Sequence, residues 1–167
     1  MDFEVRATQL ADAEFIGPLM RSVWLQTYKH ILAEDELLNQ SYKVHQPELI
    51  AAELSNIDIC SFVAVVNGVV VGHARGDHRK DNIVYVARLY LEPQFHGHGI
   101  GAQLLKRVEE AFVNVSEVRL DVYEDNKPAV GFYLSQGYEI VERATEVQSQ
   151  GKDVYEFKMR KNFICVY

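Results

Sequence analysis

Metal-binding cysteine pairs, long apolar runs and a basic surplus are all missing from this sequence of 167 residues. Its two cysteines, Cys60 and Cys165, lie outside any Cys-x-x-Cys pair, so we expect neither a metal site nor a disulfide framework. No apolar run approaches the roughly 18 residues that a membrane span needs. The first residues, MDFEVRATQLADAE, are too acidic and polar for a signal peptide. We therefore expect a cytoplasmic protein that does not contact membranes.

The charge balance also narrows the choice of partners. Lys and Arg number 17 against 24 Asp and Glu, which gives a formal net charge of −7. Because no basic surplus exists to neutralise phosphates, we do not expect a nucleic-acid partner. A negative field mildly favours the approach of a cationic substrate such as an amine. Length and composition, without repeats or a linker, are typical of one globular domain over residues 1–167.

The most informative stretch is Ile83 to Gly101. It begins as an apolar, β-branched run typical of a buried strand, breaks at Pro93, and then places glycine at 97, 99 and 101. Apolar residues follow at helical spacing. The pattern predicts a strand, a glycine loop and a helix N-terminus, where backbone N–H groups attract phosphate. Its GxGxG spacing fits neither a P-loop nor a dinucleotide fingerprint, and a turn without a ligand is the alternative.

The rest of the chain predicts an α/β domain. Strands are expected at residues 3–7, 61–66, 69–75, 118–123, 138–142 and 154–159, and helices at 34–39, 47–54 and 127–136, the last ended by Gly137. An earlier helix has its apolar face between Phe15 and Tyr28, with a kink or a start near Pro18 and a cap from Thr8 or Asp12. Asn67-Gly68 predicts a hairpin turn. We interpret the polar stretches 77–82 and 145–153 as connections.

Two blocks of this sequence resemble the GNAT superfamily of N-acetyltransferases. The family's motif, Gln/Arg-x-x-Gly-x-Gly/Ala, maps onto residues 96–101, HGHGIG, with His96 in place of Gln or Arg. That departure removes a side-chain contact and leaves the backbone amides in place. The second block comprises Leu120-Asp121-Val122, Asn126, Ala129, Phe132-Tyr133 and Gly137-Tyr138. The resemblance covers essentially the whole chain and implies a mixed central sheet that is splayed at its central strands, with helices on both faces.

The resemblance also implies acetyl-CoA as the co-substrate. Backbone amides of the glycine loop would bind its diphosphate, and its pantetheine arm would pair with the central strand, whose amide would polarise the thioester carbonyl. Asn126 would contact the cofactor, cap its own helix, or do both. The implied cofactor-binding residues are Leu89, Tyr90, Leu91, His96, Gly97, His98, Gly99, Ile100, Gly101, Ala102 and Asn126.

Catalysis in this family implies further roles. Tyr133 occupies the position of the phenol that protonates the departing thiolate, although it could equally be a core aromatic residue. The attacking amine must be neutral, and with a pKa near 10.4 only about one amine in a thousand is neutral at pH 7.4. Asp121 and Glu92 are the candidate bases, and each could instead be a solvated charge at a strand end. His73 and His98 are weaker candidates for a proton relay.

The acceptor is the least determined part. Trp24, Thr27, Tyr28 and Ile31 resemble a stretch found in members that acetylate small molecules and polyamines, and their alternative role is helix packing. We expect a primary amine of a small molecule or peptide, attacked directly in a ternary complex. A non-catalytic acyl-CoA sensor and transfer of a longer acyl group are the alternatives. The apolar tail, residues 163–167, could pack on its own sheet or on a second copy in a homodimer.

Overall fold

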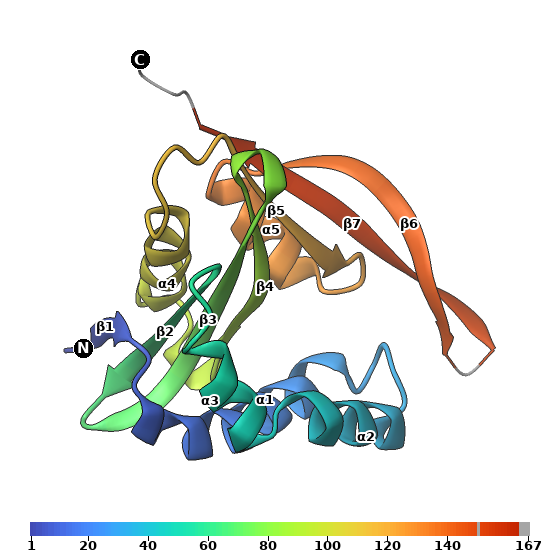
Figure 1. Ribbon diagram of the computed structural model, residues 1–167. Coiled ribbons are helices and arrows are strands. Elements are labelled where there is room, and N and C mark those ends of the chain that lie inside the picture. The colour runs from blue at the N-terminus through green and yellow to red at the C-terminus, as the bar shows by residue number, and fades with distance from the viewer. Residues whose placement is uncertain (150, 164–167) are drawn as a thin grey trace.

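The computed structural model describes residues 1–149 and 151–163 and forms an α/β fold around one mixed sheet (Figure 1). In the described residues the sheet has seven strands in the order β1-β2-β3-β4-β5-β7-β6. The strands are β1 (Glu4–Ala7), β2 (Ile59–Val66), β3 (Val69–Arg79), β4 (Ile83–Leu91), β5 (Glu117–Tyr123), β6 (Glu139–Ser149) and β7 (Lys152–Asn162). The α-helices are α1 (Ala13–Tyr28), α2 (Glu34–Val44), α3 (Pro47–Glu53), α4 (Ile100–Glu109) and α5 (Lys127–Ser135).

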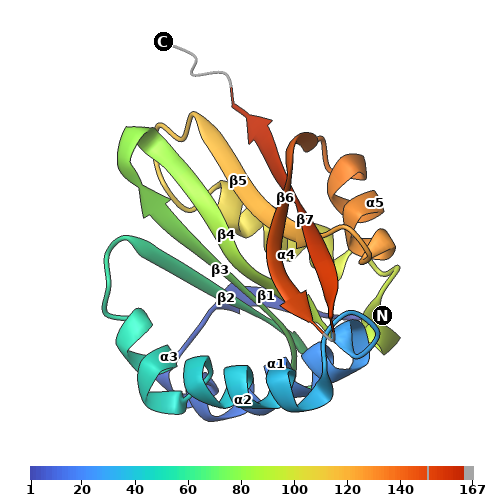
Figure 2. The same cartoon turned by 90° about the vertical axis from the view of Figure 1, so that its right-hand side faces the viewer.

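Helices cover both faces of the sheet (Figure 2). On one face the apolar stripe of α4, with Ile100, Leu104 and Val108, packs in the same core cluster as residues of β4, β5 and α5. On the other face Ile16 and Met20 of α1 pack with Ile50 of α3. None of the helices in the described ranges is long and apolar enough to cross a membrane.

The sheet opens at its centre, between β4 and β5. Their parallel pairing extends only from Ile83 to Tyr85 on β4 and from Glu117 to Arg119 on β5. Beyond Tyr85, β4 stays paired with β3 up to Leu91, and a register shift near Ala87 marks a bulge in this strand. The far half of β4 therefore has no ladder partner from β5, which confirms the prediction of a splayed mixed sheet with helices on both faces.

The alternative that the first helix starts near Pro18 is wrong. The structure has one continuous helix, α1, with Pro18 inside it. Proline removes one hydrogen bond, whereas burial of Ile16 and Met20 favours the helix on both sides of it. Gly17 has a different cause, because a Cβ there would lie 2.5 Å from the backbone oxygen of His45. It permits close packing of α1 against the end of α2.

Two details of that first helix also differ from expectation. Phe15 is 56% exposed and so lies off the buried face. Thr8 does not cap the helix, and its side chain bonds Ser61 at 2.7 Å. Asp12 is the N-cap residue of α1, as one of the two predictions had it, but its side chain does not bond the helix. Its carboxylate instead accepts hydrogen bonds from Arg6 at 2.7 Å and from the backbone N–H of Gln9. The carboxylate thereby ties the end of β1 to the turn before α1.

Most of the polar stretch 145–153 is strand, and its interpretation as a connection is wrong. β6 continues to Ser149, and β7 begins at Lys152 after Gly151, which has φ +73°. Residues 143–149, RATEVQS, are mostly polar, so the hydrophobic alternation that marks a half-buried strand is missing from the part of β6 that was not predicted. Likewise β3 continues to Arg79 and α2 to Val44, beyond the predicted ends.

Candidate active site

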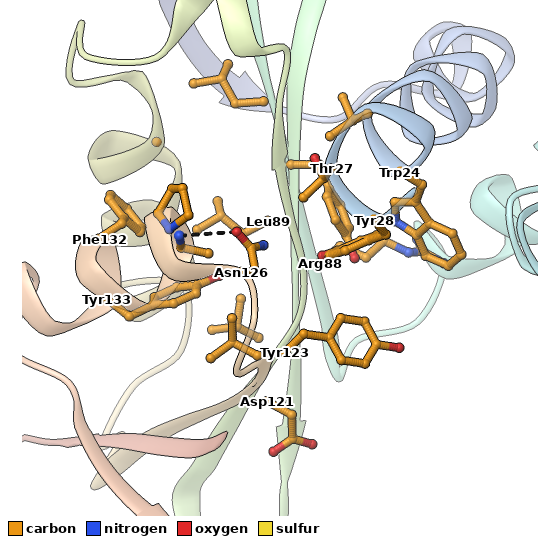
Figure 3. Close-up of a pocket in the computed structure, with 18 of the residues that line it drawn as sticks. Trp24, Thr27, Tyr28, Arg88, Leu89, Asp121, Tyr123, Asn126, Phe132 and Tyr133 are labelled. Atoms are coloured by element: carbon orange, nitrogen blue, oxygen red, sulfur yellow. Dashed lines mark hydrogen bonds between the residues drawn. The ribbon is translucent and has the colours of Figure 1, made fainter. Parts of the chain in front are cut away.

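A cleft of about 740 Å³ lies where β4 and β5 separate. It is bordered by α1 on one side and by the glycine loop and α5 on the other, and Figure 3 shows the side chains from both sides converging on it. The cleft therefore gives access to the unpaired edge of β4. Most of the residues singled out from the sequence line it, although they come from segments far apart in the chain.

The glycine loop forms one end of this cleft. Gly97 and Gly99 have φ values of +80° and +81°, a left-handed conformation that favours glycine. No protein atom lies within 4 Å of the position that a Cβ would take at either residue, so these glycines are not explained by tight packing. Gly99 is the N-cap residue of α4 and makes no side-chain cap. The first N–H groups of α4 are thus available to an anion.

The other predicted loop residues divide into three kinds. Gly101 and Ala102 line the cleft at the start of α4, and His96 lines it while its Nε2 lies 3.0 Å from the backbone oxygen of Leu91. This contact ties the loop to the end of β4. Ile100 has its side chain fully buried in the core, so only its backbone can face a ligand. His98 is exposed and does not line the cleft.

The three residues predicted on the central strand all line the cleft. Leu89 and Leu91 pack partly against the core on the α4 side, and Tyr90 packs against the cluster of α1 and α3. The ring of Tyr90 lies 6.2 Å from that of Trp24. The side chains thus brace the strand from both faces, and its backbone edge is left for a ligand in the manner of strand addition.

Tyr133 lies on α5 at the wall of the cleft, with 8% of its surface exposed. Burial, with a smaller contribution from the nearby phenol of Tyr90, raises the pKa of Tyr133 well above its usual value. The phenol therefore keeps its proton at neutral pH and is suited to donate it. Asn126 also lines the cleft, and its Oδ1 accepts a hydrogen bond from the N–H of Ala129 at 3.4 Å. The predicted capping role of Asn126 is confirmed (Figure 3).

Of the two candidate bases, the structure brings one to the cleft. Asp121 on β5 lines it, and its Oδ2 accepts a hydrogen bond of 2.5 Å from the hydroxyl of Tyr85. Glu92 follows the end of β4, is bonded by the side chain of Gln94, and does not line the cleft. His73 is fully buried outside the lining, with its Nε2 3.0 Å from Ser61 Oγ, and burial lowers its pKa to about 3.

On the acceptor side, Trp24, Thr27 and Tyr28 of α1 line the cleft as predicted from the sequence. Ile31 does not line it and instead packs behind the lining residues, in the same apolar cluster as Leu32 and Tyr28. Trp24 and Tyr28 are in edge contact, with ring centroids 6.2 Å apart. Aromatic rings therefore form much of this wall.

Sequence reasoning missed several lining residues, among them the polar side chains of Tyr85, Arg88, Tyr123 and Glu156. Tyr123 could have been found, because it lies two residues after Asp121 on a strand and so points to the same face. Glu156 left no such signal, since its place depends on the pairing of β7 with β5. The guanidinium of Arg88 is bonded to both carboxylate oxygens of Glu53, at 2.7 Å and 2.9 Å.

Comparisons with known proteins agree with this geometry. A family model described as Acetyltransferase (GNAT) family matches residues 24–138. A spermidine N(1)-acetyltransferase of Thermoplasma acidophilum is 26% identical over 146 residues, which is 84% of this chain and 90% of the relative. An uncharacterized N-acetyltransferase of Methanocaldococcus jannaschii is 29% identical over 129 residues, which is 75% of this chain and 82% of that protein.

Solved structures show the same fold. The PaiA N-acetyltransferase of Thermoplasma acidophilum in complex with coenzyme A has a TM-score of 0.82 and 25% identity, covering 98% of this chain and all of that one (100%). A GCN5-related N-acetyltransferase from Rhodopseudomonas palustris has a TM-score of 0.75 and 21% identity, covering 98% and 97%. The splayed sheet and the glycine loop of the chain thus lie within a known architecture.

Proposed function

The chain belongs to the acetyltransferase (GNAT) family and is an acetyl-CoA-dependent N-acetyltransferase, and from this premise we propose that it acetylates a primary amine by direct attack in a ternary complex, with Tyr133 as the general acid. One observation carries the proposal. A single cleft contains a glycine loop at an uncapped helix N-terminus, an open strand edge and a buried phenol whose raised pKa keeps it protonated. These are the three features that a thioester of a diphosphate-bearing cofactor requires.

The residues of the cleft fit coenzyme A. At Gly97 and Gly99 the space that side chains would take is open, and the N-terminus of α4 offers N–H groups for a diphosphate. The unpaired edge of β4 at Leu89 to Leu91 can bond the amides of a pantetheine arm. Acetyl-CoA supplies the acetyl group as a thioester. The protein must then hold this group, exclude water, donate one proton to the departing sulfur and remove another from the attacking ammonium.

The first proton belongs to Tyr133. Its Oη lies at the buried wall of the cleft, where the raised pKa keeps the hydroxyl protonated until it is needed. Proton donation to the departing sulfur makes the thiolate a better leaving group. The amide oxygen of Asn126 is already committed to its helix cap, so its NH₂ group is the part that can contact the cofactor.

The second proton must leave the attacking ammonium. Asp121 is the candidate base that lines the cleft, and we propose that it accepts this proton directly or through water. Glu92 lies outside the lining and could act only through a longer relay. Because one relative is named a spermidine acetyltransferase, a polyamine is the first acceptor to test, beside amino acids, aminoglycosides and peptides with free amino termini.

The test combines an acceptor screen with one substitution. Acetyl-CoA consumption should appear with at least one amine of the panel, and Tyr133→Phe should lower kcat by about 10²- to 10⁴-fold. The Kd of acetyl-CoA should change little, because the ring and its packing remain. Acetyl-CoA binding without turnover on any amine would indicate a sensor and overturn the proposal. An unchanged kcat in Tyr133→Phe would remove this residue from the mechanism.

Tyr138→Phe is the matched control. Tyr138 is a second buried tyrosine whose ring contacts that of Tyr133 at 5.7 Å, and its hydroxyl bonds Glu109 at 2.9 Å outside the cleft. Loss of this phenol should lower stability while kcat stays near the original value. A similar fall of kcat in both variants would mean that packing, rather than proton donation, explains the effect.

A further inference from the structure

An extra residue lies in β4 where the cleft begins. The pairing of β3 with β4 places Arg75 opposite Arg88 and the next residue of β3, Gly76, opposite Val86, so Ala87 is the residue in excess. Ala87 also lines the cleft. The bulge is therefore part of the opening between β4 and β5, and a contact that fixes the bulge also acts on the site.

The bulge changes the face on which the side chains of β4 lie. Before it, Val84 and Val86 pack in the core on the α4 side, and after it Leu89 and Leu91 pack against the same cluster. Because the side chains of a strand alternate, this change from even to odd positions results from the one extra residue. Figure 3 shows Arg88 and Leu89 on opposite sides of the strand. A slip by one residue would exchange these faces.

This half of β4 is paired on one side only. In the part of the chain that the structure describes, its pairing with β5 ends at Tyr85, so from Val86 to Leu91 the strand is paired with β3 alone. The residue pair next to the bulge also sets two cations, Arg75 and Arg88, directly opposite each other, and like charges in that position repel. The register after the bulge therefore depends on a further contact.

Glu53, the last residue of α3, supplies that contact. Its Oε1 accepts hydrogen bonds from Arg75 at 2.7 Å and from Arg88 at 2.9 Å, and its Oε2 accepts a second one from Arg88 at 2.7 Å. The side chains of Glu53 and Arg88 are only 13% and 10% exposed, so solvent screens these charges little. One carboxylate thus offsets the repulsion between the two guanidiniums and connects both strands to α3.

The surroundings support this arrangement on both faces of the sheet. Asp77 accepts a hydrogen bond from Nε of Arg75 at 2.7 Å, so a second carboxylate balances the second guanidinium. On the opposite face, Gly76 lies so close to α4 that a Cβ there would be 2.5 Å from Cγ1 of Val108. The sheet beside the bulge is therefore held between α4 on one face and the carboxylate of Glu53 on the other.

We propose that Glu53 is a positioning residue for acetyl-CoA: by holding Arg75 and Arg88 beside the bulge, its carboxylate sets how the backbone edge of Leu89 to Leu91 faces the cleft. This inference rests on the proposed pairing of the pantetheine arm with that edge and adds what holds the edge in place. Without the carboxylate, the two guanidiniums repel each other and the backbone groups lose their alignment with the amides of the arm. The diphosphate end is less affected, because α4 is anchored by its own apolar stripe.

The experiment replaces Glu53 by Gln, which keeps the shape of the side chain and removes its charge. In Glu53→Gln, titration should give a Kd of acetyl-CoA that is raised by roughly tenfold, the equivalent of about one hydrogen bond. ADP, which carries the diphosphate without the pantetheine arm, should bind with its original Kd. Hydrogen exchange gives a second readout: the amides of residues 88–91 should exchange faster, whereas those of residues 83–85, which are paired on both sides, should not change.

Asp12→Asn is the matched control, because it removes a carboxylate of similar burial from another ion pair with arginine. The side chain of Asp12 is 8% exposed, accepts hydrogen bonds from Arg6 at 2.7 Å and 3.0 Å, and does not line the cleft. This variant should lose stability while both ligands bind as before. Loss of an ion pair alone would then not explain the result with Glu53→Gln.

An unchanged Kd of acetyl-CoA in Glu53→Gln would overturn the positioning role, and so would equal weakening of acetyl-CoA and ADP, which indicates a general loss of structure. If Glu53→Gln does not fold, Glu53→Asp takes its place. It keeps the charge, shortens the reach by one methylene, and should raise the Kd of acetyl-CoA by about threefold with ADP unchanged. These results depend on binding alone. A chain that shows this pattern but acetylates no amine would overturn the proposed transfer and leave the role of Glu53 standing.

Discussion

Three buried or half-buried tyrosines show how the surroundings of one side chain decide its chemistry. The pKa of the phenol is raised in Tyr85, Tyr133 and Tyr138, and burial is the largest cause in each. In Tyr85 and Tyr138 the hydroxyl is donated to a carboxylate, Asp121 or Glu109. Tyr133 instead has a neutral phenol as its neighbour. A raised pKa is therefore common to all three, and the proposed role of Tyr133 as the acid rests on its position at the cleft wall rather than on its pKa.

His73 permits a prediction about stability and pH. Its ring is fully buried, and burial, with further effects of Arg88, His45 and Arg75, lowers its pKa from 6.5 to about 3. In the unfolded chain His73 binds a proton below pH 6.5, whereas in the folded chain it stays neutral down to about pH 3. The free energy of unfolding therefore falls as the pH falls through this window. The loss amounts to at most about 1.4 kcal/mol per pH unit. Urea unfolding in the upper half of the window, where carboxylates stay ionised, measures it.

His73→Gln should make this slope shallower, whatever the variant does to stability at neutral pH. The slope should not vanish, because burial lowers the pKa of His45 to about 4 and adds a loss of the same sign. His30→Gln, at an exposed histidine, is the control and should leave the slope as it is. An identical slope in His73→Gln would show that His73 is not neutral in the folded protein.

Gly99, the left-handed glycine directly before helix α4, has a close counterpart in Gly68. Gly99 has φ +81° and Gly68, in the turn between β2 and β3, has φ +80°, and no protein atom lies near the Cβ position of either. Alanine at each site meets the same backbone strain, about 1–2 kcal/mol. Gly99→Ala should also place a methyl group where we propose that the diphosphate binds, and so raise the Kd of acetyl-CoA by roughly tenfold or more.

Gly68→Ala separates strain from binding. It should lower the free energy of unfolding about as much as Gly99→Ala, and acetyl-CoA titration should give the original Kd. If Gly99→Ala binds acetyl-CoA as tightly as Gly68→Ala does, the loop is not the diphosphate site.

The comparison of helices and strands with the sequence shows where patterns are informative. β4 and α4 were predicted because their buried side chains form recognisable patterns: an apolar run in the strand, and apolar residues at helical spacing such as Leu104 and Val108 in the helix. The start of β6 was predicted, but its continuation to Ser149 was not, because that part of the sequence is mostly polar and has no alternating apolar residues. At Pro18, burial of the apolar helix face outweighs the hydrogen bond that proline removes, so the helix continues through this residue. In the site, the glycine loop was predicted by its motif, whereas Glu156 depends on strand pairing that no local pattern encodes.

The protein as one body is organised by the divergence of β4 and β5. Helices α1–α3 lie on one face of the sheet, and α4 and α5 pack into the core of the other. The opening of the sheet therefore creates one cleft that reaches both faces, with the glycine loop and Tyr133 on one side and the aromatic side chains of α1 on the other. Such a cleft allows two substrates to meet without a moving domain, which is what direct attack requires.

Because that cleft separates two halves of the sheet, a ligand that bridges it should stabilise the entire fold. At a concentration of about 100 times its Kd, acetyl-CoA should add roughly 2.7 kcal/mol, and for a chain of this size the melting temperature should rise by about 5–10 °C. Thermal unfolding measures the shift.

Pantetheine, which lacks the diphosphate, should give a smaller rise at the same concentration because it leaves the loop at Gly97 to Ala102 unbound. Hydrogen exchange should slow at β4 and this loop and stay unchanged at β1, which lies at the far edge of the sheet. No rise with acetyl-CoA, or equal rises with both compounds, would contradict the placement of the diphosphate at the loop.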